Sequence, residues 1–405
     1  MNLPLKVYEF YNCFFINLPL ILVIILKIID TIKFKGKNLN RINIILLLSI
    51  ISLNSIAQNE KDSCSSEVYF GFKTLYGYVW SHHKFMEHLT ERHFSCYEFN
   101  LGKQTNGDEG WQRIYNYPEY GLSFWYSNLG NSQYLGNAYG LFPYIKLPYI
   151  NNKKLDFGFR LGCGLGYLSK HFERLENYKN NAIGSHFNVL IDIKLNLNYK
   201  VYKNLFLSCG IGITHFSNGA VKMPNRGINI PSINIGLNYY LKEKQFLKLK
   251  TPIQNISKNE FKIIGNLGIK ETYQSFGDKY MAYSLSGNCF RNFSTKRKLG
   301  IGLDIFYDTS NKKRLEKKGT IISNDFEIIK PGINIGQEWK ISKLTIVFQI
   351  GSYLYTKDKN DGYIYDRLAL QYDLKKNLFI NVSLKTHFAK ADFIEWGIGY
   401  KFKKN

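Results

Sequence analysis

The chain has 405 residues, of which 45% are hydrophobic and 16% aromatic, and its formal net charge is +23. Its six cysteines are scattered singly and without metal-ligand spacing, so the composition excludes a disulfide framework and indicates neither a metal site nor a cofactor. No nucleic-acid-binding motif accompanies the basic charge. We therefore expect no nucleic-acid partner; the positive surface either meets anionic lipid or only keeps the protein soluble and oriented.

The N-terminal segment has the pattern of an export signal. A basic region precedes the apolar run at 42–51, and a small-x-small end follows at Ala57, so we expect cleavage near Ala57. A second apolar run at 14–26 lies upstream; we interpret it as an over-extended reading frame, with a membrane anchor as the alternative. The predicted organisation is a leader over 1–57, followed by one exported domain over 58–405.

After the leader, the chain alternates between apolar and polar residues in segments of ~10 to 15 residues that are rich in Tyr, Phe, Gly and Asn. No stretch there has the ~20 apolar residues of a transmembrane helix. The pattern predicts an all-β protein, a single transmembrane antiparallel β-barrel of about 12–16 strands with both ends periplasmic. The segments are 68–80, 93–103, 119–128, 134–149, 154–170, 185–199, 204–217, 227–241, 261–276, 280–292, 297–309, 325–340, 342–356, 363–373, 376–388 and 391–402.

A lysine-rich stretch at 242–260 interrupts the alternation. It is either a periplasmic excursion or a boundary between two halves, 65–241 and 261–402. In the predicted topology short turns lie on the periplasmic side and long loops, such as 218–226, on the extracellular side. The run 104–118 is long for a periplasmic turn, which counts against this arrangement.

The segment 204–217 ends in a histidine and a serine two residues apart. Residues i and i+2 of a strand point to the same side, so His215 and Ser217 share a face with an apolar row on that strand. If the next strand extends back through Pro231, Asn229 falls on its apolar side too. A candidate base, a candidate nucleophile and an amide would then meet at one end of a hairpin, on the lipid side.

These residues resemble a known family. The run His215–Gly219, the run Pro224–Asn229 and a membrane-facing strand are similar to outer-membrane lipid A 3-O-deacylases, and more closely to the longer acyloxyacyl hydrolase proteins of Bacteroidetes. The further matching runs are Gly110–Gln112, Tyr117–Gly121, Asn177–Ser185 and Lys385–Phe393. The resemblance implies a carboxylic ester hydrolase of a Gram-negative outer membrane that acts on lipid A in the outer leaflet.

The resemblance also implies residue roles. Ser217 corresponds to the nucleophile and His215 to the base, while Asn218 and the backbone near Gly219 match the oxyanion position. Asn229 stands where the smaller deacylases have a glutamate, so we expect it to be the third member. An asparagine can orient a histidine but stabilises imidazolium less than a carboxylate does. Two other candidates, Glu395 and His387, are predicted to face the lumen.

Several alternatives stay open. A non-catalytic barrel, either a porin-like channel or a structural protein, is the second function, and a channel needs a wide, charged lumen. A histidine-rich loop suggests either a metal site or a solvated loop, and a basic loop suggests either a lipid A phosphate contact or a solvated loop. The two loops contain His82, His83 and His88, and Lys170, His171, Arg174 and Lys179, respectively. Trp80, Trp111 and Trp125 are expected in an interfacial girdle.

Overall fold

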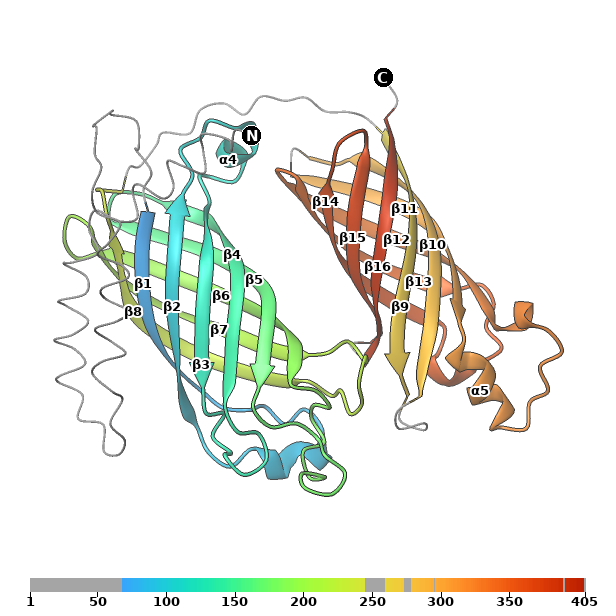
Figure 1. Cartoon of the computed structure of the whole chain (residues 1–405). Coiled ribbons are helices and arrows are strands. Elements are labelled where there is room, and N and C mark those ends of the chain that lie inside the picture. Colours follow the sequence, from blue (N-terminus) through green and yellow to red (C-terminus); the bar gives the residue numbers. More distant parts are fainter. Residues whose placement is uncertain (1–67, 245–258, 273–277, 295, 389, 404–405) are drawn as a thin grey trace, which may run out of the picture. The chain divides into compact units, whose positions relative to one another are not determined.

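The computed structural model describes residues 68–244, 259–272, 278–294, 296–388 and 390–403. The predicted leader and its cleavage site lie outside these residues. The described chain is almost entirely antiparallel β-structure, and the sixteen strands fall within a few residues of the sixteen predicted segments (Figure 1). Among the described residues, no helix is long and apolar enough to cross a membrane.

The strands form two closed barrels of eight strands each. The first barrel contains β1 (Val68–Gly77), β2 (Phe94–Gln104), β3 (Glu119–Ser127), β4 (Ala138–Asn151), β5 (Leu155–Leu168), β6 (Phe187–Lys200), β7 (Leu205–Ser217) and β8 (Ile228–Tyr240). The second contains β9 (Asn259–Glu271), β10 (Lys279–Asn292), β11 (Arg297–Asp308), β12 (Ile329–Ile341), β13 (Leu344–Tyr353), β14 (Ile364–Asp373), β15 (Leu378–His387) and β16 (Lys390–Lys403). The short helices are η1 (Lys84–Leu89), α4 (Gly110–Ile114), α5 (Ser310–Glu316), η2 (Asp325–Ile328) and η3 (Lys359–Asp361).

The prediction of a single barrel is therefore wrong, although the strand count and the all-β class are confirmed. β1 pairs with β8, from Tyr69 opposite Tyr240 to Gly77 opposite Ser232, and this pairing closes the first barrel before β9 begins. β9 pairs in the same way with β16. Alternation reveals which face of a strand meets lipid, but closure depends on which two edge strands pair, and that pairing is not local in sequence.

Side chains fill the interior of the first barrel. Glu98, fully buried, accepts hydrogen bonds from Arg160 (2.5 Å) and from Lys194. A second network joins Lys146 and Lys244 to Asp156, at 2.7 and 2.6 Å. An eight-stranded barrel has an interior just wide enough for side chains, so these networks occupy the space that a channel would need.

Removing the Glu98 carboxylate should destabilise the first barrel. Glu98→Ala removes one of the two buried carboxylates that Arg160 and Lys194 share, the other being Asp192, and breaking a buried ion pair costs about 3–5 kcal/mol. Denaturant titration of the refolded protein in detergent, followed by the heat-modifiable shift in electrophoretic mobility, measures this loss. Glu109→Ala, which changes an exposed carboxylate before α4, is the control and should leave the midpoint unchanged; equal midpoints for both variants would contradict the prediction.

The second barrel is also filled with paired charges. Arg367 binds Glu395 at 2.7 Å and Asp304 at 3.1 Å, and Lys262 binds Glu338 at 2.5 Å. His387 donates to or accepts from Tyr353 at 2.8 Å in the interior. The prediction that Glu395 and His387 face the lumen is confirmed, since both are buried.

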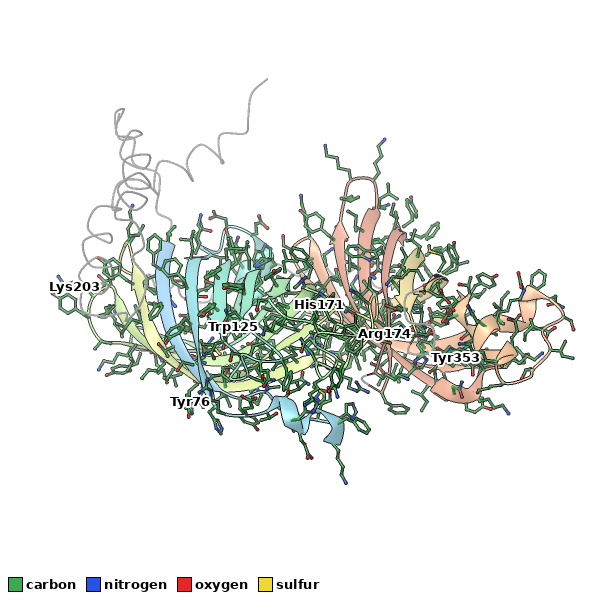
Figure 2. The ribbon with its side chains drawn as sticks, turned by 60° about the horizontal axis from the view of Figure 1, so that its bottom comes forward. Tyr76, Trp125, His171, Arg174, Lys203 and Tyr353 are labelled. Carbon is green, nitrogen blue, oxygen red and sulfur yellow. The ribbon has the colours of Figure 1, made fainter. Side chains whose placement is uncertain are left out.

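In both barrels the outer face is apolar and aromatic. On β1, Tyr76 points outward and is 54% exposed, and Lys203 lies in the turn between β6 and β7 (Figure 2). Trp125 is an exception to the predicted girdle: it is fully buried inside the first barrel, where its ring lies 5.6 Å from that of Phe216 in a tilted arrangement. The outward row of β3, including Tyr120 and Phe124, is aromatic as well, so alternation alone did not assign this tryptophan to a face.

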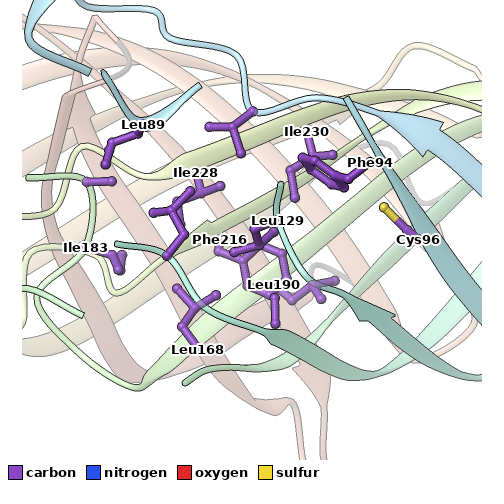
Figure 3. Close-up of a cluster of buried hydrophobic side chains, with 14 of the residues drawn as sticks. Leu89, Phe94, Cys96, Leu129, Leu168, Ile183, Leu190, Phe216, Ile228 and Ile230 are labelled. Atoms are coloured by element: carbon purple, nitrogen blue, oxygen red, sulfur yellow. The ribbon is translucent and has the colours of Figure 1, made fainter. Parts of the chain in front are cut away.

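Long loops cover one end of the first barrel. The loops 78–93, 128–137, 169–186 and 218–227 lie at this end, and the short turns after β4 and β6 lie at the other. In bacterial outer-membrane barrels long loops are extracellular. The loops and strand ends share a hydrophobic cluster (Figure 3). Its members include Leu89, Leu129, Leu168, Ile183, Leu190, Phe216, Ile228 and Ile230. This packing gives the loop residues beside β7 and β8 a rigid support.

Candidate active site on the outer face of the first barrel

β7 carries the candidate histidine and serine at its long-loop end. Burial alternates along the strand, with Phe206, Ser208, Thr214 and Phe216 buried inside, and Leu207, Cys209 and Ile211 exposed outside. His215 and Ser217 continue the outward row by position. Only His215 keeps the alternation, since it is half-buried; Ser217 is buried, with 8% of its surface exposed, like its neighbour Phe216.

Asn229 lies opposite His215 in the pairing of β7 with β8. It belongs to the outward row of β8 with Ile233 and Ile235. Its Oδ1 lies 2.6 Å from His215 Nδ1, a short side-chain hydrogen bond. Because Oδ1 can only accept, His215 carries a proton on Nδ1, and its Nε2 has a free lone pair.

Ser217 follows on the same face, two residues beyond His215. No hydrogen bond joins Ser217 Oγ to His215 in the described part of the chain. In unliganded enzymes such bonds are commonly long and shorten when substrate is bound. The structure thus brings His215 and Asn229 into contact and places Ser217 on their side of the strand.

Asn218 has other partners than an oxyanion. Its Nδ2 donates to Ser185 Oγ and to the Lys222 carbonyl, both at 2.8 Å, and its backbone N–H donates to Asn225 Oδ1 at 2.9 Å. These bonds hold the loop between β7 and β8. Gly219, which has a positive φ of 61°, turns the chain directly after Asn218. The sequence predicts two oxyanion groups, the Asn218 side chain and the backbone near Gly219. Since the Asn218 side chain holds the loop, the backbone near Gly219 is the remaining group.

Gly227 packs directly against the imidazole. A Cβ on this residue would lie 2.7 Å from His215 Cε1, and its φ is +80°. Its backbone N–H donates to the Ala182 carbonyl at 3.1 Å. Gly227 lies in the quoted family run, but no pattern in a single sequence shows that a glycine contacts a ring.

His82 contacts the candidate site, although its place in the sequence does not indicate this. It is one of three histidines for which the sequence predicts either a metal site or a solvated loop, and its Nδ1 lies 3.2 Å from Asn229 Nδ2. Among the described residues, no group of three or more His, Cys, Asp or Glu side chains is arranged to hold a metal ion. The pKa of His83 is lowered from its ordinary value by burial and then by His82 and Arg226.

The basic loop between β5 and β6 is tied to its neighbours. Lys170 Nζ donates to the Gln133 carbonyl at 2.9 Å, and His171 Nε2 lies 3.2 Å from Glu173. Lys179 lies over the ring of Tyr134 at 5.6 Å. These contacts give the loop a structural role in the extracellular cap, and a contact with phosphate stays a prediction.

The fold and the site together define a class of protein: an outer-membrane β-barrel protein with a serine, a histidine and an asparagine grouped on its outer face. Two family models match the chain, "Lipid A 3-O-deacylase (PagL)" over residues 97–238 and "Acyloxyacyl hydrolase, C-terminal domain" over residues 259–404. Each model covers about a third of the chain, so the chain is similar to the first family within the first barrel and to the second family over the second barrel. The predicted resemblance to lipid A 3-O-deacylases and acyloxyacyl hydrolases is confirmed, as is the outer-membrane location, while the Bacteroidetes source stays a prediction.

Solved structures are similar over part of the chain. The outer-membrane enzyme PagL is 17% identical with a TM-score of 0.31, covering 41% of this chain and 97% of that one. Neisserial surface protein A is 10% identical with a TM-score of 0.29, covering 43% and 98%. A comparison with curated proteins found no match.

Proposed function

We propose that the protein is an esterase that removes an acyl chain from lipid A by a Ser–His mechanism on the lipid-facing exterior of the first barrel. The observation that carries this proposal is the 2.6 Å bond between His215 Nδ1 and Asn229 Oδ1 on the outer face, beside Ser217. The bond leaves His215 Nε2 as a proton acceptor. The similarity to these two families supplies the reaction class and the substrate.

The chemistry follows the general serine-hydrolase scheme. Ser217 Oγ attacks the ester carbonyl while His215 Nε2 takes its proton, and a tetrahedral oxyanion forms. When this intermediate collapses, the C–O bond to the sugar breaks and His215 returns the proton to the leaving alkoxide. Water then hydrolyses the acyl-serine by the same route, releasing a fatty acid and restoring the hydroxyl.

The Gly219 backbone N–H is suited to stabilise the oxyanion, because Gly219 turns the chain two residues after the nucleophile, whereas the Asn218 N–H already donates to Asn225 Oδ1. Asn218 then acts indirectly, by holding this turn through its bonds to Ser185 and Lys222. The third member, Asn229, stabilises the imidazolium through a neutral dipole.

An apolar groove of about 660 Å³ crosses the outer face next to this site. Its lining includes Ile213 and Pro231, the outward neighbours of His215 and Asn229, and continues away from the loop end through Ile211 and Ile233. An acyl chain lying there stays in an apolar environment during the reaction. Moving the ester into the lumen would instead expose hydrocarbon at ~0.8 kcal/mol per CH₂.

The channel alternative required a single barrel with a wide lumen, and the structure has none among the described residues. A sixteen-stranded barrel would enclose a wide lumen, whereas each of the two barrels has eight strands and an interior occupied by ion-paired side chains. A non-catalytic structural barrel is the remaining alternative, and it makes the opposite prediction for Ser217.

Mass spectrometry of lipid A from cells that express the protein tests the proposal. Wild type should yield lipid A lighter by one acyl chain, and Ser217→Ala should yield unmodified lipid A at equal outer-membrane abundance. Cys209→Ala, on the same strand and face as Ser217, is the matched control and should deacylate normally. Full deacylation by Ser217→Ala would show that Ser217 is not the nucleophile and would favour the non-catalytic barrel.

Asn229 should contribute less than the histidine or the serine. Asn229→Ala removes the acceptor for His215 Nδ1 and should lower turnover about 10- to 100-fold, with little effect on stability, because the residue lies at the hairpin mouth. Asn229→Glu should retain activity by restoring the carboxylate of the smaller deacylases. Initial rates on purified lipopolysaccharide measure both effects; an unchanged rate for Asn229→Ala would show that another group orients His215.

A further inference from the structure

A loop histidine continues the hydrogen-bonded chain beyond Asn229. Trp80 and His82 lie on the loop after β1, and the Trp80 backbone N–H donates to the Asn229 carbonyl at 2.8 Å. This bond brings the His82 ring to the amide end of the Asn229 side chain, where Nδ2 and His82 Nδ1 are 3.2 Å apart. The chain of contacts is therefore His82, Asn229 and His215, from the loop to the face of β7.

An asparagine in this position has an orientation problem that a glutamate lacks. Its amide can rotate by 180°, which would present Nδ2 instead of Oδ1 to His215. A donor facing His215 Nδ1 would favour the tautomer with the proton on Nε2. That tautomer cannot accept the proton of Ser217, whereas the two oxygens of a carboxylate are equivalent and carry no such risk.

The partners of His82 determine which way the amide points. His82 Nε2 lies 3.1 Å from the Arg226 carbonyl, which can only accept, so this nitrogen carries the proton of a neutral ring. Nδ1 then has a lone pair and accepts from Asn229 Nδ2. A longer approach of Nδ1 to the Trp80 carbonyl, at 3.4 Å, would need a proton on Nδ1 and is the weaker alternative.

The Arg226 carbonyl is itself held in place. The Arg226 backbone N–H donates to the Ala182 carbonyl at 2.8 Å, and Nη1 of its side chain donates to the Asn181 carbonyl at 2.8 Å. The chain of donors and acceptors is consistent from the Arg226 carbonyl through His82 and Asn229 to His215. Each link fixes the proton position of the next one.

We propose that His82 is a positioning residue that fixes the Asn229 amide with Oδ1 toward His215, and thereby the catalytic tautomer of His215. This inference rests on the proposed function for its activity readout. His82 is needed because an asparagine amide has two orientations. In an Asn229→Glu variant, His82 would have no such orientation to fix.

The test compares His82→Ala in two backgrounds, using initial rates on purified lipopolysaccharide. In the wild-type background it should lower kcat about 10- to 100-fold with KM nearly unchanged. In the Asn229→Glu background the same change should alter kcat less than about twofold, because a carboxylate has no orientation to fix. His82→Gln should recover most of the wild-type rate, since its amide can accept from Asn229 and donate to Arg226 at once.

His88→Ala is the loop control, because His88 also ties the loop to a carbonyl, that of Lys179 at 2.7 Å, but lies outside the chain of contacts. It should leave kcat unchanged. An equal loss for His82→Ala in both backgrounds would overturn the proposal and show that His82 only supports the loop.

A second readout separates this inference from the proposed function. Side-chain ¹⁵N chemical shifts of His215, assigned with a His215→Gln variant in detergent micelles, report its tautomer. We expect the Nδ1–H form in wild type and a mixture in His82→Ala. An unchanged tautomer would overturn the inference even if Ser217 proves catalytic, and a changed one would support it even if Ser217→Ala retained full deacylation.

Discussion

The double variant His215→Ala/Ser217→Ala should deacylate lipid A about as slowly as either single variant. Each single variant should lose roughly 10⁴-fold or more in turnover, because the serine has no activated hydroxyl without the base, and the base has no proton to take without the serine. Groups that act as one unit are not additive. The double variant should therefore fall within a few-fold of the singles.

Single-turnover deacylation of lipopolysaccharide by purified protein measures these rates over several decades. Folding is checked by the heat-modifiable mobility shift, which should be retained, since neither side chain belongs to the buried networks of Glu98 and Asp156. Losses that multiply in the double variant would show two independent contributions, and the proposed Ser–His unit would be wrong.

Much of the fold was accessible from the sequence, because alternation is a local property. Each of the sixteen strands was predicted to within a few residues, and the outward rows of β7 and β8 were assigned correctly, including Asn229. The number of barrels was not accessible. The closing pairs, such as Gly77 with Ser232, join residues far apart in the chain, and a strand pattern contains no information on which edges meet.

The candidate site likewise contains some residues that the sequence predicts and others that it does not. His215, Ser217 and Asn229 come from two adjacent strands, so spacing and register predict that they lie together. His82 and Gly227 lie on loops. The paths of these loops depend on hydrogen bonds between loops, such as those that the Ala182 carbonyl accepts from the Arg226 and Gly227 N–H groups. Asn218 was matched to the oxyanion position through the family run, but its donors are directed to Ser185, Lys222 and Asn225, contacts that sequence position alone does not reveal.

Gly227→Ala should nearly abolish activity although it adds only one methyl group. The added Cβ would lie 2.7 Å from His215 Cε1, closer than carbon contacts allow, and 3.2 Å from the Phe216 carbonyl oxygen, a tight contact. The Phe216 carbonyl belongs to the strand ladder, so the imidazole is the group that has to move. A displacement of the base by ~1 Å costs on the order of 10²-fold in rate.

The positive φ of Gly227 adds backbone strain to the steric clash, and a control variant separates the two effects. An alanine at φ +80° is strained by roughly 1 kcal/mol in any surroundings. Gly319→Ala carries the same strain at φ +76°, with no atom within 4 Å of the new Cβ, and should keep the wild-type rate. Initial rates and the mobility shift of both variants should show two folded proteins, of which only Gly227→Ala is inactive. If Gly227→Ala deacylated lipid A at the wild-type rate, His215 would not occupy the position from which we derive the mechanism.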